Sequence, residues 1–471
     1  MTISNKLASG ILAAAFAVAA TGCHIYQKFE MPDSTALTRE YVEAKAAEVD
    51  STSLGALPWQ QVFTDPMLTD LINQALENNT DLKNAKLNID VAHANMLGAR
   101  LSYLPSVALA PQGGNSATNL PGGGWSNKNW TYNIPLSVSW EIDVFGKTLN
   151  TKRSAETAYE MSKDYEQAVR SQIIGGVANC YYAISTLAAQ LELQKETAKI
   201  WSESIETMKA MKEAGMTTEA AVVQSTAQYY SILASISDLE TSLEQANTTL
   251  SLLVGQMPQS WPIQPALSVT LPAEFNAGVP MVALANRPDV RAQERQLAIA
   301  YYTTNSARAA FYPSLSISAN GGFTNSLGTM IFNPGKWFVN LAGQLTAPLF
   351  ARGQNIARLK ASKAQQEQAL NTFEYTVMKA AGDVSNALTA YENVRSKEEM
   401  LRKQVDCMTQ AVDITETLFT NSATNYNTTY LEVLTAQQNL LGTQMGLLNC
   451  ALARSQAVVN LYQSLGGGGG K

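Results

Sequence analysis

The stretch GARLSYLPSVAL at residues 98–109 returns as SARAAFYPSLSI at residues 306–317, with a constant offset of 208 positions. The same offset aligns the wider ranges 79–115 and 287–323 without a gap. A repeat of this length within one chain predicts two halves of the same architecture. The Pro-Ser pair inside both stretches precedes a short alternation of apolar and polar residues, which indicates a strand that follows a helix.

The duplication extends through the rest of each half. Phe145 aligns with Phe350 at an offset of 205, and the triplet Leu253-Val254-Gly255 aligns with Ser464-Leu465-Gly466 at an offset of 211. We therefore expect each half to contain a helix, a strand, a loop, a second strand and a pair of long helices, in that order.

Composition limits the possible partners. Charged residues make up 15% of the 471 residues, and the formal net charge is −6. Globular proteins carry about 25% charged residues. No basic field is present that would hold a nucleic acid, so we expect no DNA or RNA partner.

The N-terminus has the pattern of an export signal. Lys6 precedes an apolar stretch at residues 11–20, which is long enough for a signal peptide and too short to span a bilayer. The stretch ends in Ala-Thr-Gly-Cys, which resembles a bacterial lipobox, with Cys23 as the lipidated first residue of the mature chain. An ordinary signal next to a free cysteine is the alternative.

The remaining cysteines and the histidines have no metal-site spacing. Cys180, Cys407 and Cys450 fall in separate expected helices, and His24 and His93 are far apart. We expect the cysteines to be small core residues and expect no metal site and no catalytic histidine.

Residues 130–142, WTYNIPLSVSWEI, alternate apolar and polar side chains with a strict period of two. Residues 337–349 carry a looser version of the pattern in the second half. Strands are expected at about 103–114, 129–145, 312–323 and 337–350, with Gly- and Asn-rich loops at 112–129 and 323–336. These lengths suit transmembrane strands, with Trp130, Trp140 and Trp337 at the membrane interfaces. A soluble sandwich with one hydrated face is the alternative.

Four strands cannot close a barrel. An open sheet edge in hydrocarbon would leave backbone groups unpaired, at a cost of several kcal/mol each. Three copies would supply twelve strands, which leaves a polar lumen, because about eight strands already fill a barrel interior with side chains. The pattern therefore predicts a trimeric pore.

The helical segments are long and lack proline. From residue 150 to 213 apolar residues recur at spacings of three and four, and residues 434–462 keep a seven-residue repeat. Such seams are typical of coiled coils. Turns are expected at Gly215 and within residues 421–429, where each helix pair folds back on itself. Five prolines between residues 258 and 280 forbid regular helix there.

These patterns divide the chain into six segments. They are a signal peptide at 1–22, a lipidated N-terminal extension at 23–60, a first repeat at 61–254, a Pro-rich linker at 255–280, a second repeat at 281–465 and a Gly-rich tail at 466–471.

Several longer phrases resemble the TolC-like outer-membrane factors, in particular the lipoprotein branch that serves tripartite efflux systems. The phrases are WQQVFTDPML at 59–68, SWEIDVFGK at 139–147, VPMVALANRPDV at 279–290, TYLEVLTAQQ at 429–438 and the closing LGGGGG. The resemblance implies a mixed membrane protein: an outer-membrane β-barrel with four strands per protomer and twelve in a trimer, continuous with a long periplasmic α-helical coiled-coil barrel and a mixed equatorial domain. It implies an efflux duct without a cofactor.

The same resemblance implies a homotrimer in outer-membrane lipid, with a periplasmic adaptor protein and an inner-membrane pump as partners. The adaptor would dock at the helix-pair tips, which correspond to Gly215, Met216, Thr217, Thr218 and Glu219, and to Asn421, Tyr426 and Tyr430. A periplasmic gate would lie at Glu432 and Thr435. The family often has acidic residues at both gate positions, so Thr435 is a departure that puts a second acidic ring in doubt. Glu432 can also be read as a solvated residue favoured by a helix N-terminus.

Three other functions remain as alternatives. The same duct with an ATP-driven pump would secrete proteins. A structural or adhesive surface lipoprotein would explain the coiled coils but not the paired amphipathic strands. An enzyme would need a supported nucleophile or acid–base pair, and the sequence contains no GxSxG or HExxH motif.

Overall fold

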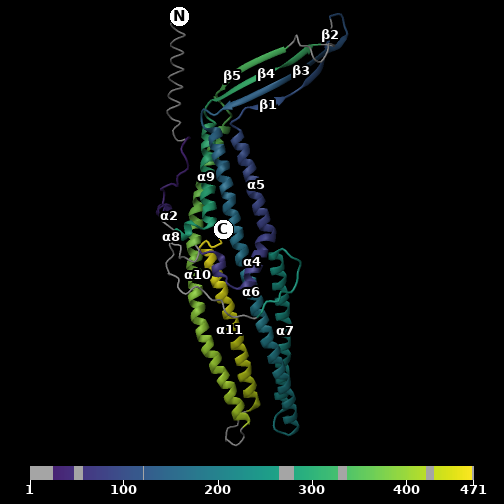
Figure 1. The fold of residues 1–471 in the computed structure, drawn as a ribbon, viewed down its shortest axis with the longest axis vertical. Coiled ribbons are helices and arrows are strands. Elements are labelled where there is room, and N and C mark those ends of the chain that lie inside the picture. Colours follow the sequence, from purple (N-terminus) through teal and green to yellow (C-terminus); the bar gives the residue numbers. More distant parts are fainter. Residues whose placement is uncertain are drawn as a thin grey trace. The chain divides into compact units, whose positions relative to one another are not determined.

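The structure, a computed structural model, describes residues 25–46, 57–119, 121–264, 281–326, 337–420 and 429–468. In the described residues the second half has the expected order of elements, and the first half differs by one additional strand, β2. The helices are α2 (Ala36–Ala46), α3 (Trp59–Val62), α4 (Pro66–Asn78), α5 (Thr80–Leu101), α6 (Lys147–Glu213), α7 (Glu219–Val254), α8 (Met281–Ala285), α9 (Pro288–Ala309), α10 (Gln354–Thr420) and α11 (Tyr430–Ser464), and the strands are β1 (Ser106–Leu109), β2 (Gln112–Asn119), β3 (Trp125–Ile142), β4 (Ser314–Ser326) and β5 (Trp337–Thr346) (Figure 1).

The duplication is visible in the element lengths. The first long helix of each half, α6 or α10, contains 67 residues. The chain nevertheless forms two compact units that each combine segments of both halves. The strand unit contains residues 25–33, 88–163 and 292–374, and the helix unit contains residues 34–87, 164–291 and 375–468.

The strands that the structure describes lie in one antiparallel sheet of the strand unit, in the order β1-β3-β4-β5. β2 also pairs with β3, at residues 112–119, so β1 and β2 occupy the same edge of β3 end to end. Between them lies Pro111, which has no N–H for the ladder. The sheet therefore has four strand positions, as the sequence predicts.

The expected loop at 112–129 is wrong over most of its length, and the expected loop at 323–336 starts later than predicted. Residues 112–119 and 125–129 belong to β2 and β3, which form a long hairpin, and β4 continues to Ser326. The Gly- and Asn-rich composition suggested turns, but cross-strand pairing with β3 overrides this local preference. Residues 327–336 lie outside the described part of the chain.

The register separates the sheet into an apolar and a polar face. Leu136 of β3 lies opposite Leu109 of β1 and Gly321 of β4, and Gly321 lies opposite Val339 of β5. One residue along, serine and asparagine occupy the row of Ser137, Asn320 and Asn340. On the apolar face Val339 is 85% exposed within a single chain. A large exposed apolar surface of this kind is typical of a site that contacts another protein or a membrane.

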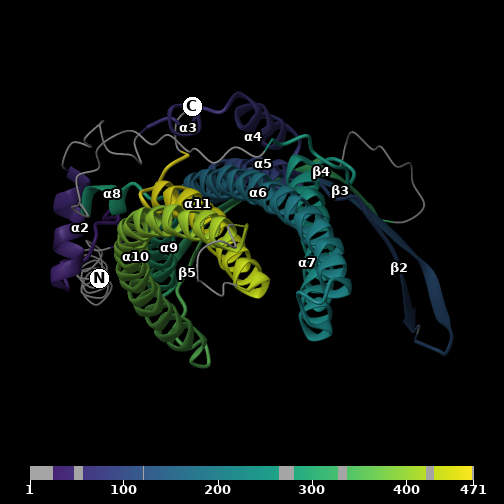
Figure 2. The ribbon, with the colours of Figure 1, turned by 90° about the horizontal axis from the view of Figure 1, so that it is seen from below.

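In the helix unit, α10, α11, α6 and α7 lie next to one another in that order (Figures 1 and 2). Arg454 of α11 pairs with Glu398 of α10 at 3.0 Å. The amide of Gln190 on α6 donates to Asn449 on α11 at 2.9 Å, and Lys195 on α6 pairs with Glu240 on α7. These contacts confirm that the long helices pack side by side as two hairpins.

The phrase FTDP at residues 63–66 forms the start of α4. Asp65 is the N-cap, and its carboxylate accepts hydrogen bonds from the N–H groups of Met67 and Leu68 at 2.8 and 3.2 Å. Pro66 occupies the first turn, where its missing N–H costs nothing. Phe63 then packs edge to face on Tyr462 of α11, with 5.8 Å between ring centroids, inside the core of the helix unit.

Among the described helices, none combines the length and the apolar character required to cross a bilayer. Cys180, Cys407 and Cys450 are free thiols, and only Cys450 is fully buried. The expectation that all three are core residues is therefore wrong for Cys407, which is exposed on α10.

Candidate functional site

The first helix-pair tip is a tight turn at residues 214–218. Gly215 has φ +72°, and its N–H bonds to the carbonyl of Lys212, while the N–H of Met216 bonds to the carbonyl of Met211 at 2.8 Å. This pair of bonds is a Schellman motif, which satisfies the last carbonyls of α6 and favours glycine at the left-handed position. The turn therefore lies where the sequence predicts it.

The return helix is capped by Thr218, whose hydroxyl accepts from the N–H of Ala221 at 3.3 Å. Glu219, in the first turn of α7, forms an ion pair with Lys212 across the turn. Thr217 completes the loop. Met216 is 71% exposed, so this well-fixed turn presents one large apolar side chain.

The second tip is described only from Thr429 onward, and Asn421 and Tyr426 lie outside the described residues. Tyr430 begins α11, and its ring lies 5.1 Å from that of Phe419 at the end of α10. Tyr430 and Leu434 also pack against the cluster formed by Trp201, Met208 and their neighbours on α6 and α7. The start of α11 is therefore attached to the first hairpin by apolar contact.

Both gate candidates are exposed within a single chain. Glu432 and Thr435 are one turn apart on α11, whereas Val433 and Leu434 between them are buried. The hydroxyl of Thr435 donates to the carbonyl of Leu431 at 2.7 Å. Within the described residues, the Glu432 carboxylate forms no ion pair. The two side chains thus share a face that is available to another molecule.

The candidate interface tryptophans belong to the sheet. Trp130 lies in β3. The indole N–H of Trp140 donates to the carbonyl of Tyr103 at 2.9 Å, and the Trp337 ring lies 4.2 Å from that of Phe323. The register places Trp140 and Trp337 on the apolar face. Cys23, the lipidation candidate, lies outside the described residues.

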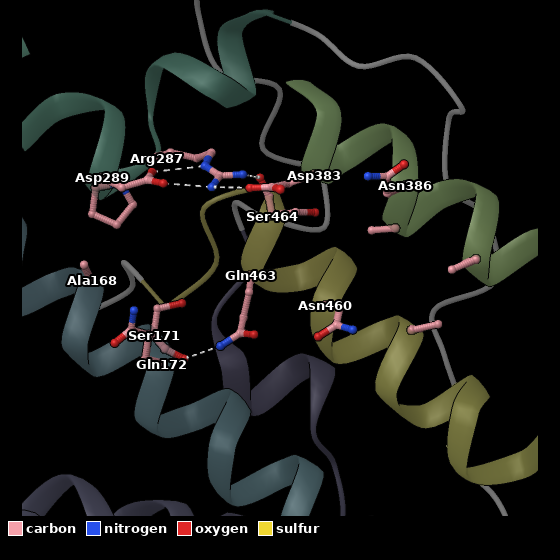
Figure 3. Close-up of a pocket in the computed structure, with 14 residues that line it drawn as sticks. Ala168, Ser171, Gln172, Arg287, Asp289, Asp383, Asn386, Asn460, Gln463 and Ser464 are labelled. Atoms are coloured by element: carbon pink, nitrogen blue, oxygen red, sulfur yellow. Dashed lines mark hydrogen bonds and ion pairs between the residues drawn. The ribbon is translucent and has the colours of Figure 1, made fainter. Parts of the chain in front are cut away.

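A polar cluster that the sequence analysis did not single out occupies the helix unit (Figure 3). Arg287 forms a bidentate ion pair with Asp289, at 3.0 and 2.8 Å, and also reaches Asp383 at 3.2 Å. Its remaining nitrogen donates to the carbonyl of Ser464, at the C-terminus of α11, at 3.0 Å. A pocket of about 530 Å³ lies beside this cluster.

The first repeat contains the neutral counterpart of this cluster. Asn79, which the offset of 208 aligns with Arg287, donates to the carbonyl of Leu253 at 2.9 Å. Leu253 aligns with Ser464 at the offset of 211. The two offsets read from the sequence thus relate the Asn79–Leu253 bond to the Arg287–Ser464 bond, although they do not by themselves reveal either contact.

Comparison with known proteins decides the family. A family model described as outer membrane efflux protein matches residues 71–256 and 279–467, one segment in each repeat. The chain belongs to the outer membrane efflux protein family. It is an efflux protein of the outer membrane. Of the proteins compared below, TtgI is named as an efflux pump protein and MtrE as a channel.

The chain is 28% identical to the "Probable outer membrane lipoprotein SilC" of Salmonella typhimurium, over 87% of this chain and 88% of that one. It is 29% identical to the toluene efflux pump outer membrane protein TtgI of Pseudomonas putida, over 95% and 96% of the two chains. The solved open state of the Neisseria gonorrhoeae MtrE outer membrane channel superposes with a TM-score of 0.80 at 26% identity, covering 94% of this chain and 97% of that one.

Proposed function

We propose that this efflux protein is a homotrimeric exit duct whose three sheets close into one barrel in the outer membrane. The sheet is the observation that supports this proposal. It has four strand positions, and within the described residues β5 and the β1/β2 position each pair on one side only. Three copies would pair these edges with one another and leave no backbone group unpaired in hydrocarbon.

The two faces of the sheet fit the same arrangement. The row of Leu109, Leu136 and Val339 would face lipid, and the row of Ser137, Asn320 and Asn340 would face the lumen. Trp140 and Trp337, on the apolar face, would lie at the membrane interfaces together with Trp130, as aromatic belts do. The lumen would then be polar and open to water.

In this proposal the long helices continue the duct into the periplasm as a coiled-coil barrel, joined to the strands by a mixed equatorial domain. The adaptor protein docks at the tips, where exposed Met216 on the fixed turn offers an apolar anchor. An inner-membrane pump supplies the energy, and the duct uses no cofactor.

The gate is proposed at Glu432 and Thr435. Both side chains are exposed on one face of α11, close to its N-terminus. Threefold symmetry would place three Glu432 carboxylates in a ring, and Thr435 would provide hydroxyls in place of a second acidic ring. Opening requires α11 to leave Trp201 and Met208, on which Tyr430 and Leu434 pack. Two discrete helix packings of this kind are typical of switches.

Cys23 is proposed as the lipid anchor in the outer membrane. The lipobox-like sequence before it supports this role, and the relative SilC is named a lipoprotein. The names of the relatives differ in substrate. TtgI is named for toluene, and the cation efflux system protein CusC of Escherichia coli, 26% identical over 96% of this chain and 97% of that one, is named for cations. We therefore place substrate selection upstream, at the pump. These names favour a duct for small solutes over one for protein secretion.

Deletion of the gene tests the function directly. A strain without the duct should accumulate a fluorescent efflux substrate, and the wild-type chain should restore export. A chain carrying Val339→Asp and Leu341→Asp, on the apolar face of β5, should fail to restore it because the charged strand cannot enter lipid. The same substitution at Asn340, on the polar face, is the control. Unchanged accumulation after deletion would favour a structural surface lipoprotein.

A further inference from the structure

A second pocket, of about 650 Å³, lies in the strand unit next to the first described residues of the chain. It belongs neither to the tips nor to the arginine cluster. Aromatic and aliphatic side chains dominate its lining, which carries one positive charge and no acidic side chain. The lining residues include Ile25, Tyr301, Arg308, Phe311, Tyr312 and Leu359.

The N-terminal segment is fixed beside this pocket. The side-chain amide of Asn150 donates to the carbonyl of Ile25 at 3.0 Å, and Arg153 donates to the carbonyls of Tyr26 and Gln27 at 2.9 and 3.0 Å. Ile25 itself is 3% exposed. Residues 25–27, the first that the structure describes, are therefore held in a defined position at the pocket wall.

The aromatic walls are supported from behind. The Tyr301 ring makes an edge contact with Phe29 at 5.7 Å, and the Tyr312 ring stacks on Phe145 at 5.0 Å with an interplanar angle of 17°. These contacts with Phe29 and Phe145 hold the two rings in place from the protein side. Binding an apolar group there costs little ordering of the protein.

One residue, His24, separates Ile25 from Cys23. Two extended residues span at most about 7 Å, so the lipidated cysteine starts within about 7 Å of the Ile25 backbone. We propose that one fatty acyl chain of the lipid on Cys23 lies in this pocket. The proposal rests on the lipidation of Cys23 proposed above.

Arg308 gives the pocket a polar end that suits an acylglycerol. Arg100, at the matching position of the first repeat, pairs with Glu156 at 2.9 Å. Arg308 instead donates to the amide oxygen of Asn305 at 2.6 Å and, among the described residues, pairs with no carboxylate. Its other N–H groups can donate to ester oxygens of the lipid, while Ile25, Phe311 and Leu359 contact the hydrocarbon chain.

Photo-crosslinking tests the proposal. Cells are fed a fatty acid that carries a diazirine, the intact outer membrane is irradiated, and the purified protein is digested with trypsin. Tandem mass spectrometry should find the lipid of peptide 23–28 joined to peptide 309–336 at Phe311 or Tyr312, and not at the β4 residues of that peptide that lie on the apolar sheet face. Cross-links from this lipid only to bilayer lipid, or only to peptide 337–352 of the apolar sheet face, would overturn it.

A stability cycle gives a second readout. In the lipidated protein Leu359→Asn should lower the melting temperature by a few degrees and remove the cross-link, whereas in a Cys23→Ser protein exported by an ordinary signal its effect should be much smaller. Ile356→Asn, an exposed position one turn earlier on α10, is the control and should act alike in both backgrounds. Equal effects of Leu359→Asn in both backgrounds would overturn the proposal.

The mass of peptide 23–28 distinguishes a missing lipid anchor from an anchor whose acyl chain lies outside the pocket. A peptide without acyl groups would overturn both the anchor and the occupied pocket, while channel conductance would still report on the duct. An acylated peptide with no coupling to Leu359 would overturn the pocket alone.

Discussion

The Arg287 guanidinium lies 3.0 Å from the Ser464 carbonyl oxygen, and in the first repeat the Asn79 amide lies 2.9 Å from the Leu253 carbonyl oxygen. Both bonds join the start of a mid-length helix to the end of a long hairpin. Gly255 and Gly466, in left-handed conformations with φ +76° and +83°, follow the two hairpin ends. The duplicated chain thus closes each repeat by the same bond, with a charged donor only in the second.

Removing the charged donor should destabilise the helix unit. Arg287→Ala leaves the Ser464 carbonyl without this partner and Asp289 without its bidentate cation, and hydrogen bonds to charged groups contribute about 1.5–3 kcal/mol each before screening. The carboxylates of Asp289 and Asp383 are partly exposed. We therefore expect the free energy of unfolding, measured by chemical denaturation, to fall by about 2–3 kcal/mol. Arg287→Asn should lose less stability, because the Asn79 amide makes the equivalent hydrogen bond in the first repeat.

Lys195→Ala is the control for this substitution, because it breaks an exposed ion pair with Glu240. Such pairs contribute about 0–1 kcal/mol. A loss for Arg287→Ala no larger than that of Lys195→Ala would contradict the closing role of Arg287.

The same bond predicts an acid dependence. Burial alone raises the pKa of Asp289, but the hydrogen bonds and charge of Arg287 outweigh it and hold this pKa below its usual 3.8. A carboxylate whose pKa is lowered in the native state stabilises the fold at any pH above its ordinary pKa. This contribution disappears as the pH falls through the native pKa. Denaturation midpoints measured from pH 6 to pH 2 should therefore fall less steeply below pH 3.8 in Arg287→Ala than in the wild type. Parallel pH dependences for the two proteins would contradict the stabilisation of the Asp289 carboxylate by Arg287.

The first tip predicts a local defect in docking. Met216→Asp places a charge on the apolar residue that the turn presents, so we expect loss of adaptor co-purification and of efflux with the trimer intact. Met257→Asp is the matched control, since Met257 is 83% exposed but follows the other end of α7. If both variants retained the adaptor, docking at residues 214–218 would be wrong.

The gate proposal predicts the effect of Glu432→Ala on conductance. A ring of three carboxylates would hold the helix starts together through cations or donors of neighbouring copies, so its removal should raise the conductance of the purified trimer in planar bilayers several-fold. Glu399→Ala removes an exposed carboxylate that pairs with Lys403 on α10 and should leave conductance unchanged. No difference between the two variants would remove Glu432 from the gate.

Much of the fold could be predicted from periodicity and duplication. The period-two stretch at residues 130–142 lies in β3, and the proline-free stretch from residue 150 lies in α6. The turn at Gly215 could be predicted because a left-handed helix end favours glycine. These features depend on local sequence, so a single sequence reports them.

The features that could not be predicted from the sequence depend on contacts between distant segments. Gly113 and Gly114 suggested a loop, yet they pair with Tyr132 and Thr131 in the ladder between β2 and β3. Arg287 has no local pattern that reveals its partners, since Asp383 and Ser464 are about 100 and 180 positions away. The placement of Glu432 and Thr435 in a gate depends on neighbouring copies and stays a prediction.

Closure by three copies is the central claim, and one measurement on detergent-extracted protein tests it most directly. The molar mass by light scattering is determined together with single-channel recordings of the same fractions in planar bilayers. The account predicts a trimer that forms pores, with low conductance in the resting state. A monomeric species that never forms a pore, including after Glu432→Ala, would contradict it.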